Sequence, residues 1–242
     1  MNIPKIYVSE IFNSIQGEGI LTGYQTLFVR LQGCRIGCVW CDTKYTWKKS
    51  DKHTHSAYDL YEEIKNSVKP ESWICITGGE PLEQITSVLW LAEKLQHNDF
   101  TKLSIETAGV IDIGRTGNII LPDNKEILDL VATGMFFSIS PKLKSALKER
   151  FNIIKLLELM NVWDMLIDAP FRAQYKFVVS TTEDLDIVKH IALNSKTKHY
   201  IIIQLEESKI KDVSFIAECC KFIKLFPQIR FTVQQHKVLN LK

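Results

Sequence analysis

Three cysteines in one short loop have the residue type and spacing to carry chemistry. Cys34, Cys38 and Cys41 lie in the stretch Gly-Cys-Arg-Ile-Gly-Cys-Val-Trp-Cys-Asp-Thr, with the spacing C-x-x-x-C-x-x-C. A four-iron cubane cluster is normally held by four cysteine thiolates. A loop that offers three can hold three irons and leave the fourth open to a small molecule. The spacing therefore predicts a 4Fe-4S site whose open iron binds a ligand.

Two other kinds of site compete with the cluster as explanations for these cysteines. A structural zinc ion takes four nitrogen or sulfur ligands, commonly from two pairs of closely spaced residues. No second cysteine pair of this kind follows the loop, and His53 and His55 stand at the wrong distance in a polar run. Three unrelated buried thiols would not need a glycine-rich loop. A zinc-binding module without catalysis is kept as the alternative from a different functional class.

Length and charge favour a small-molecule enzyme. The chain has 242 residues, enough for one domain of the α/β barrel type, which we expect to span residues 1–242. Its 30 basic and 28 acidic residues nearly cancel, so no overall field attracts nucleic acid or a membrane. The N-terminus lacks an apolar leader, and no apolar run reaches the ~18 residues that span a bilayer. We therefore expect a cytoplasmic protein whose function depends on a local site.

The other cysteines are expected to be structural. Cys75 lies in an apolar, strand-like run, whereas Cys219 and Cys220 are neighbours in a helical pattern. Adjacent cysteines are poorly placed to bridge distant elements by disulfides. We expect all three to be reduced and to pack in the core.

Strands and helices alternate along the chain, which predicts right-handed βαβ units and a parallel sheet. Because there are fewer clear units than a complete eightfold barrel has, we expect an open, partial TIM-like barrel, with a flat doubly wound sheet as the alternative. Residues 6–15 form an apolar-rich lead-in, and residues 44–55 are expected to be a polar, exposed segment. The pattern is least clear over 143–173, where the part from Asn161 onward fits a loop or a frayed helix equally well. The expected strands are 25–31, 73–77, 102–106, 135–140, 174–179, 199–205 and 229–234, and the expected helices are 56–68, 84–97, 124–133, 144–161, 182–194 and 211–225.

Polar motifs lie in turns and at strand ends. The turn at residues 16–19, Gln-Gly-Glu-Gly, lets the backbone approach a ligand while two polar side chains flank it, although a plain surface turn explains it as well. Arg30 stands near the end of its strand, where a guanidinium can bind a carboxylate through two hydrogen bonds. Residues 78–81, Gly-Gly-Glu-Pro, follow a buried strand, and the paired glycines are expected to present backbone groups to an incoming ligand.

The cysteine loop together with Gly-Gly-Glu-Pro resembles the radical S-adenosylmethionine (SAM) enzymes, in which the open iron is chelated by SAM. Four blocks narrow the resemblance to the 7-carboxy-7-deazaguanine synthases, which belong to the queuosine (7-deazapurine) pathway of tRNA modification. These blocks are residues 12–19, residues 28–47, the Ile-Glu-Thr-Ala-Gly and Ser-Pro-Lys motifs at 105–109 and 140–142, and the tail 234–242.

The resemblance implies a lyase that converts 6-carboxy-5,6,7,8-tetrahydropterin to 7-carboxy-7-deazaguanine with release of ammonia. It implies a 4Fe-4S cluster, SAM and Mg²⁺ as cofactors, and reductive cleavage of SAM to methionine and a 5′-deoxyadenosyl radical. It also implies a flavodoxin-like or ferredoxin-like electron donor and a homodimer. A glycyl-radical-activating enzyme, which shares the cysteine loop and Gly-Gly-Glu-Pro, is the second enzymatic alternative, and the pterin-specific blocks argue against it.

The resemblance also assigns roles to individual positions. The cluster ligands would be Cys34, Cys38 and Cys41, and Thr43 would give an oxygen to Mg²⁺. Three positions depart from the usual family pattern. Ala108 stands where Ser or Asn is frequent, Leu205 stands where proline is frequent, and Lys242 stands at the end where a small apolar residue is usual. The implied SAM contacts are Trp40, Gly79, Ser140, Pro141, Lys142 and Gln204, and the implied pterin contacts are Ile15, Gln16, Gly17, Glu18, Arg30, Thr77, Glu106, His236 and the terminal carboxylate of Lys242.

Overall fold

The computed structural model describes residues 3–241, apart from the side chain of His53. Within that range one nine-stranded sheet runs through the molecule in the order β11-β10-β9-β8-β5-β4-β2-β1-β3. Its strands are β1 (Lys5–Ile15), β2 (Gln25–Leu31), β3 (Thr54–Ser56), β4 (Trp73–Gly78), β5 (Leu103–Thr107), β8 (Phe136–Ile139), β9 (Ala173–Val179), β10 (Tyr200–Leu205) and β11 (Ile229–Thr232).

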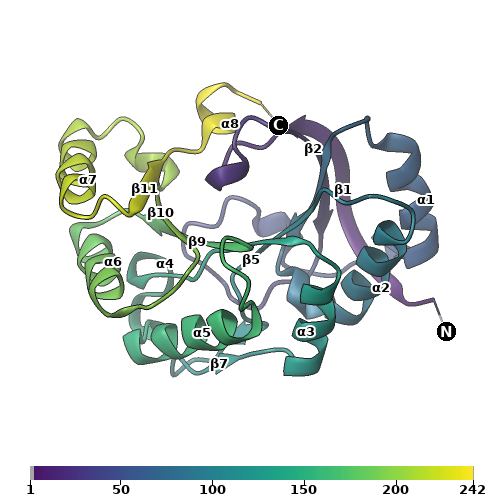
Figure 1. Cartoon of the computed structure of the whole chain (residues 1–242), viewed down its shortest axis with the longest axis horizontal. Coiled ribbons are helices and arrows are strands. Elements are labelled where there is room, and N and C mark those ends of the chain that lie inside the picture. Colours follow the sequence, from purple (N-terminus) through teal and green to yellow (C-terminus); the bar gives the residue numbers. More distant parts are fainter. Residues whose placement is uncertain (1–2, 242) are drawn as a thin grey trace.

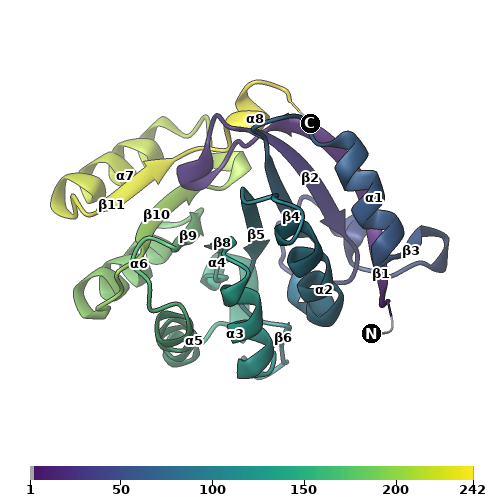
Figure 2. The same cartoon turned by 45° about the vertical axis from the view of Figure 1, so that its right-hand side comes forward.

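Neighbouring strands from β2 to β11 are parallel, and the helices between them cover the outer face of a curved sheet (Figures 1 and 2). The strand order ends at β11 on one side and β3 on the other, so the sheet described by residues 3–241 is open. The predicted α/β fold, an open partial barrel, is confirmed. The helices are α1 (Ala57–Ser67), α2 (Ile85–Gln96), α3 (Asn124–Ala132), α4 (Lys144–Leu147), α5 (Ile153–Leu166), α6 (Thr182–Asn194), α7 (Val213–Leu225) and α8 (Gln235–Val238).

Local sequence explains where the regular helices begin. Helix α1 starts after Ser56, whose side-chain oxygen accepts a hydrogen bond from the backbone N–H of Asp59 at 3.0 Å. Its buried residues, Ala57, Leu60, Tyr61 and Ile64, recur at the helical period and face the core. Helix α6 begins with a reciprocal capping box between Thr181 and Asp184. Both predicted helices are confirmed to within one residue at either end.

The expected lead-in at residues 6–15 is a strand. β1 pairs antiparallel with β2, and the rings of Phe12 and Phe28 stack across the pair with centroids 5.2 Å apart. The register shifts between Val8 and Glu10. Such an irregularity interrupts the strict alternation that marks a strand in sequence.

The single helix expected over 144–161 is wrong. The chain forms α4, then a 3-10 turn at Lys148–Arg150, and then α5, which continues to Leu166. Lys148 has a φ of +55° and a ψ of −125°, and a right-handed α-helix cannot continue through that conformation. Asn152 then starts α5 by accepting hydrogen bonds from the N–H groups of Ile154 and Lys155. Four short elements were also missed: β3, β6 (Asp112–Ile113), β7 (Ile119–Ile120) and α8.

Two expectations about burial need correction. Cys75 and Cys219 are buried, as predicted, but Cys220 is exposed, because its neighbour Cys219 occupies the core-facing side of α7. Thr46 is buried although it lies in the segment expected to be exposed. Its backbone carbonyl accepts from Gly33 N, so this segment folds back onto the cysteine loop.

The parallel arrangement brings distant polar residues to one edge of the sheet. Arg30 of β2 lies opposite Thr77 of β4, Glu106 of β5 lies opposite Ser138 of β8, and Gln204 of β10 is flanked by β9 and β11. All of these positions are at or near the carboxyl ends of their strands, where parallel α/β folds place their sites. In the described part of the chain, no helix has the length and apolar character needed to cross a bilayer.

Candidate active site

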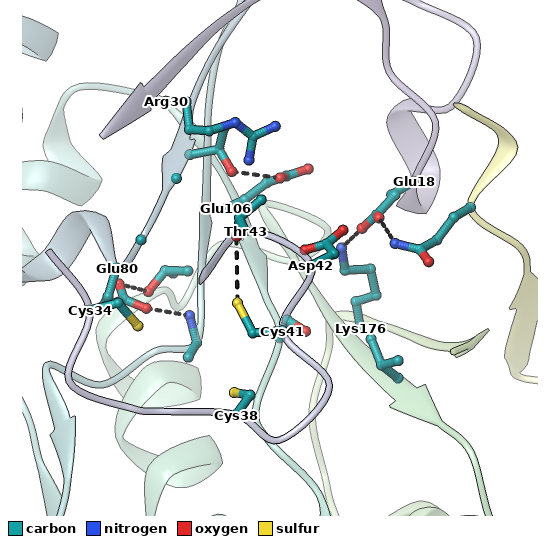
Figure 3. A pocket seen from close by; sticks show the side chains of 18 of the residues that line it. Glu18, Arg30, Cys34, Cys38, Cys41, Asp42, Thr43, Glu80, Glu106 and Lys176 are labelled. Atoms are coloured by element: carbon teal, nitrogen blue, oxygen red, sulfur yellow. Dashed lines mark hydrogen bonds and ion pairs between the residues drawn. The ribbon is translucent and has the colours of Figure 1, made fainter. Parts of the chain in front are cut away.

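A large cavity opens at the carboxyl ends of the strands (Figure 3). Pro141 is not among its lining residues and instead borders a smaller neighbouring cavity with Lys142, and Lys242 lies outside the described residues. The residues singled out in the sequence that do line it are Ile15, Gln16, Gly17, Glu18, Arg30, Cys34, Cys38, Trp40, Cys41, Thr43, Thr77, Gly79, Glu106, Ser140, Lys142, Gln204 and His236.

The cysteine loop is held by the Gly-Gly-Glu-Pro motif. Gly79 N donates to Leu31 O at 3.0 Å and Glu80 N donates to Gly33 O at 2.7 Å. A Cβ on Gly79 would stand 2.2 Å from Gly33 O, so this approach needs glycine. The paired glycines were expected to present backbone groups to a ligand, but the Gly79 N–H binds the end of β2 and the Glu80 N–H binds the start of the loop.

The three cysteines suit a cluster in which each binds a different iron. Figure 3 shows their sulfur atoms around a common space at one side of the cavity. Within residues 3–241, no three His, Cys, Asp or Glu side chains converge on a single ion. A cubane does not require such convergence, because its ligands sit on separate irons. Trp47 Nε1 also donates to Cys41 Sγ at 3.3 Å.

Burial controls the protonation of these thiols. It raises the pKa of Cys34 to about 12, with a further increase from the nearby Glu80 carboxyl, and it also raises the pKa of Cys38. The two thiols therefore hold their protons at neutral pH unless a cation is bound, and binding of iron must displace those protons. This environment suits metal ligands better than free nucleophiles.

Glu80 is a fully buried carboxyl beneath the loop. It accepts hydrogen bonds from the Thr107 hydroxyl and, at 2.8 Å, from Ala108 N, as Figure 3 shows, and it also caps the turn at Leu82. Burial raises its pKa to about 7, although these hydrogen bonds oppose the increase. Glu80 thereby ties the end of β5 to the cysteine loop.

Gln204 offers unsatisfied polar atoms to the cavity. Its side chain is fully buried, and neither its amide nitrogen nor its amide oxygen has a hydrogen-bond partner among the described residues. Unpaired buried polar groups are costly, so such an amide fits a ligand that offers both a donor and an acceptor. SAM carries groups of both kinds, and the cavity residues therefore fit the cofactor that the sequence predicts.

Glu106 is fixed at the centre of the lining. Its carboxylate accepts from Gln16 Nε2 at 3.0 Å and from Thr77 Oγ1 at 2.9 Å. Arg30 lies nearby, where its Nε donates to Glu10 at 2.8 Å and its guanidinium lies over the Phe12 ring. Arg30 also lines the cavity (Figure 3), so its side chain is directed into the site and not to the outside of the sheet. The arrangement places a fixed carboxylate and a fixed guanidinium in one cavity.

Glu18 forms a buried ion pair with Lys176 and accepts from Gln234 Nε2 at 2.7 Å (Figure 3). Burial alone would raise the pKa of Glu18, but the Lys176 charge and these hydrogen bonds outweigh it and lower the pKa to about 2. For Lys176 the directions are opposite: burial alone would lower its pKa, but the charges of Glu18 and Glu106 outweigh burial, and the pKa is raised. Both side chains are therefore ionised at neutral pH.

Three of the residues that build the site were missed in the sequence. Lys176 lies in an apolar strand, and a lone charge in a buried strand is the signal that could have identified it. Gln234 was noted only as part of a motif. Arg150 donates to Gly37 O at 3.0 Å and to Ile113 O at 3.1 Å, so it holds the cysteine loop from the 3-10 turn that interrupts the helix expected over 144–161.

Comparisons with known proteins agree with this geometry. Residues 15–154 match the family model described as "4Fe-4S single cluster domain". The 7-carboxy-7-deazaguanine synthase of Methanospirillum hungatei JF-1 is 30% identical over 97% of this chain and 85% of its own length. The synthase of Escherichia coli K12 is 27% identical over 97% of this chain and 98% of its own length.

The chain belongs to the 7-carboxy-7-deazaguanine synthase family.

The solved structures include a member of this family with the same fold. The crystal structure of QueE from Escherichia coli superposes with a TM-score of 0.64 at 25% identity, covering 95% of this chain and 94% of that one. The family predicted from the four sequence blocks is confirmed.

Proposed function

We propose that the protein converts 6-carboxy-5,6,7,8-tetrahydropterin to 7-carboxy-7-deazaguanine with release of ammonia, as a carbon–nitrogen lyase in queuosine biosynthesis. The observation that carries the proposal is that one cavity joins the cysteine loop to the Gln-Gly-Glu-Gly turn and to the tail. These are the blocks that distinguish this family in the sequence. The lining extends from Phe12 to His236, so we further propose that the whole chain acts as one catalytic domain.

The side chains divide the cavity between cofactor and substrate. Cys34, Cys38 and Cys41 would hold the cluster, and Gln204 with Lys142 would contact SAM. When bound, the cluster supplies the electron that cleaves SAM and starts radical chemistry on the substrate. Proteins that host such chemistry must keep reacting atoms in contact and exclude water.

On the substrate side, the chain supplies charge and hydrogen bonds. Arg30 would bind the carboxylate of the pterin, because a guanidinium pairs with carboxylates through directed hydrogen bonds. Glu106 would accept hydrogen bonds from pterin N–H groups, since Gln16 and Thr77 already fix its orientation. His236 lies against Gly17, where a Cβ would approach His236 Nδ1 to 2.4 Å, so it closes over the substrate side.

We assign the magnesium ion to Thr43, which lines the cavity and lies with its Oγ1 3.6 Å from Cys41 Sγ. Mg²⁺ prefers oxygen ligands and can bridge a hydroxyl, waters and a substrate carboxylate. The Thr43→Ala variant is expected to need about tenfold more Mg²⁺ for half-maximal rate and to keep its iron content. Rate assays across magnesium concentrations test this, and an unchanged requirement would count against the assignment.

We also propose a one-electron carrier of the flavodoxin or ferredoxin type as reductant, and a homodimeric assembly. Both follow from family membership.

Anaerobic incubation with SAM, reductant and carboxytetrahydropterin tests the activity. Mass spectrometry is expected to detect 7-carboxy-7-deazaguanine and ammonia, whereas a protein with all three cysteines changed to alanine should produce neither. Reconstituted protein that cleaves SAM without transforming this pterin would overturn the proposed substrate. Colourless protein with stoichiometric zinc would overturn the cluster.

A further inference from the structure

The segment after β11 folds back over the turn that follows β1, as Figures 1 and 2 show for α8. Gln235 N donates to Gly17 O at 3.0 Å, and His236 packs where a side chain on Gly17 would otherwise stand. No described residue from 231 to 241 is buried, so the tail has little apolar packing to hold it in place. Polar contacts must therefore supply much of its attachment.

Lys237 provides one such contact and reaches two other segments. Its Nζ lies 3.4 Å from Asp42 Oδ2 and 3.2 Å from Glu207 Oε2. Asp42 directly follows Cys41, and Glu207 begins the 3-10 turn Glu207–Lys209 after β10, the strand that carries Gln204. Both acids line the cavity. One ammonium group thus joins the tail, the cysteine loop and the Gln204 strand at the rim of the site.

We propose that Lys237 is a positioning residue that fixes the tail, and with it His236, against the cysteine loop. By fixing the tail, Lys237 sets the separation between the pterin side and the SAM side of the cavity. The catalytic consequence of this role rests on the proposed function. Asp42 and Glu207 are 45% and 54% exposed, so the ion pairs contribute little to overall stability. Alignment is far more sensitive than stability, since small displacements of reacting groups reduce rates strongly.

The first test uses hydrogen exchange and does not depend on activity. In the purified protein without substrate or SAM, Lys237→Met is expected to increase amide exchange about tenfold in the peptide covering residues 234–241. Lys237→Arg should restore protection because it keeps the charge. The matched control is Lys198→Met, which breaks an exposed pair with Asp168 at 3.2 Å and should leave the tail peptide unchanged.

The second test measures coupling in the reconstituted enzyme. Lys237→Met should keep the iron content, raise the KM for the pterin about tenfold, and increase the ratio of 5′-deoxyadenosine to product. Glu207→Gln, which removes one partner, should give a smaller change in the same direction. Unchanged tail exchange in folded Lys237→Met, or failure of arginine to restore it, would overturn the proposal. Absence of the deazaguanine product from the wild-type enzyme would overturn the proposed function and leave the exchange result intact.

Discussion

Glu18 and Lys176 carry buried opposite charges, and each charge is stabilised in the interior by the other. Their side chains are 13% and 7% exposed. Removing one member of a buried ion pair leaves an uncompensated charge in the interior, which typically costs about 3–5 kcal/mol. Removing both charges costs much less. The effects of substituting Glu18 and Lys176 on the free energy of unfolding are therefore expected to be strongly non-additive.

We predict that Lys176→Met lowers the free energy of unfolding by about 3–5 kcal/mol, and that adding Glu18→Gln recovers more than half of this loss. Urea denaturation of the single and double variants measures the coupling. The exposed pair changed by Lys198→Met provides the comparison, with an expected loss of about 0–1 kcal/mol. Simple additivity of the Lys176 and Glu18 changes would contradict the prediction.

The ion pair between Glu18 and Lys176 should also make the stability of the fold depend on pH in the acid range. The pKa of Glu18 is lowered from 4.5 to about 2 in the folded protein. A carboxyl with a depressed pKa stabilises the fold fully above its unfolded value and loses that contribution as pH falls through the folded value. The Glu18 contribution is thus present above about pH 4.5 and lost toward pH 2. Glu18→Gln should lack this part of the acid dependence, which denaturation series across this pH range would show.

At the scale of elements, the break between α4 and α5 has a role in the site. Arg150 ends the 3-10 turn there, and its guanidinium bridges the carbonyl of Gly37 in the cysteine loop and that of Ile113 in β6. Val39 N also donates to Ala146 O in α4 at 3.1 Å. A continuous helix over this stretch would lack the 3-10 turn that places Arg150 against the loop.

We predict that Arg150→Met loosens the cysteine loop without unfolding the protein. Hydrogen bonds from a charged donor contribute about 1.5–3 kcal/mol each, and the methionine keeps an apolar stem. After anaerobic reconstitution, the variant should hold less iron and sulfide and lose its visible absorbance about tenfold faster in air. Lys155→Met, which breaks an exposed pair with Glu158, is the control and should match wild type. Wild-type retention of the cluster in Arg150→Met would refute the role.

For the whole molecule, the tail adds residues to the substrate side of the site from outside the apolar core, whereas Arg30, Thr77 and Glu106 lie on strands that also build the core. The buried apolar residues come from the sheet and its covering helices, and the last of them is Ile229. The tail contributes to the cavity without contributing to this core. Folding and substrate binding are therefore separable at the C-terminal end.

We predict that a chain ending at Val233 folds and binds SAM but does not bind the pterin. Circular dichroism should be unchanged, and the melting temperature should move by no more than about 4 °C, because little buried surface is lost. Calorimetric titration with SAM and with carboxytetrahydropterin separates the two affinities. Retained pterin affinity, or loss of the fold, would each contradict the assignment of the tail to the substrate side.

The sequence by itself determined the features that depend on neighbouring residues. The cysteine spacing is local. The apolar period is local too, and it predicted the bounds of α1 and α6 to within one residue. Strand–helix alternation imposed a parallel sheet, and a parallel sheet gathers its carboxyl ends at one edge. The family resemblance assigned Arg30, Thr77 and Glu106 to one ligand, and this edge of the parallel sheet is the physical reason that they meet.

Only the tertiary structure decided contacts that depend on register and on long separations. Lys176 and Gln234 reach Glu18 across 158 and 216 residues, and Arg150 reaches Gly37 across 113. Such pairs follow from how crossovers and strand offsets set neighbours in space, and no local period records them. The positive φ of Lys148, between α4 and α5, is likewise not recorded in the sequence, because a lysine has no intrinsic preference for that conformation.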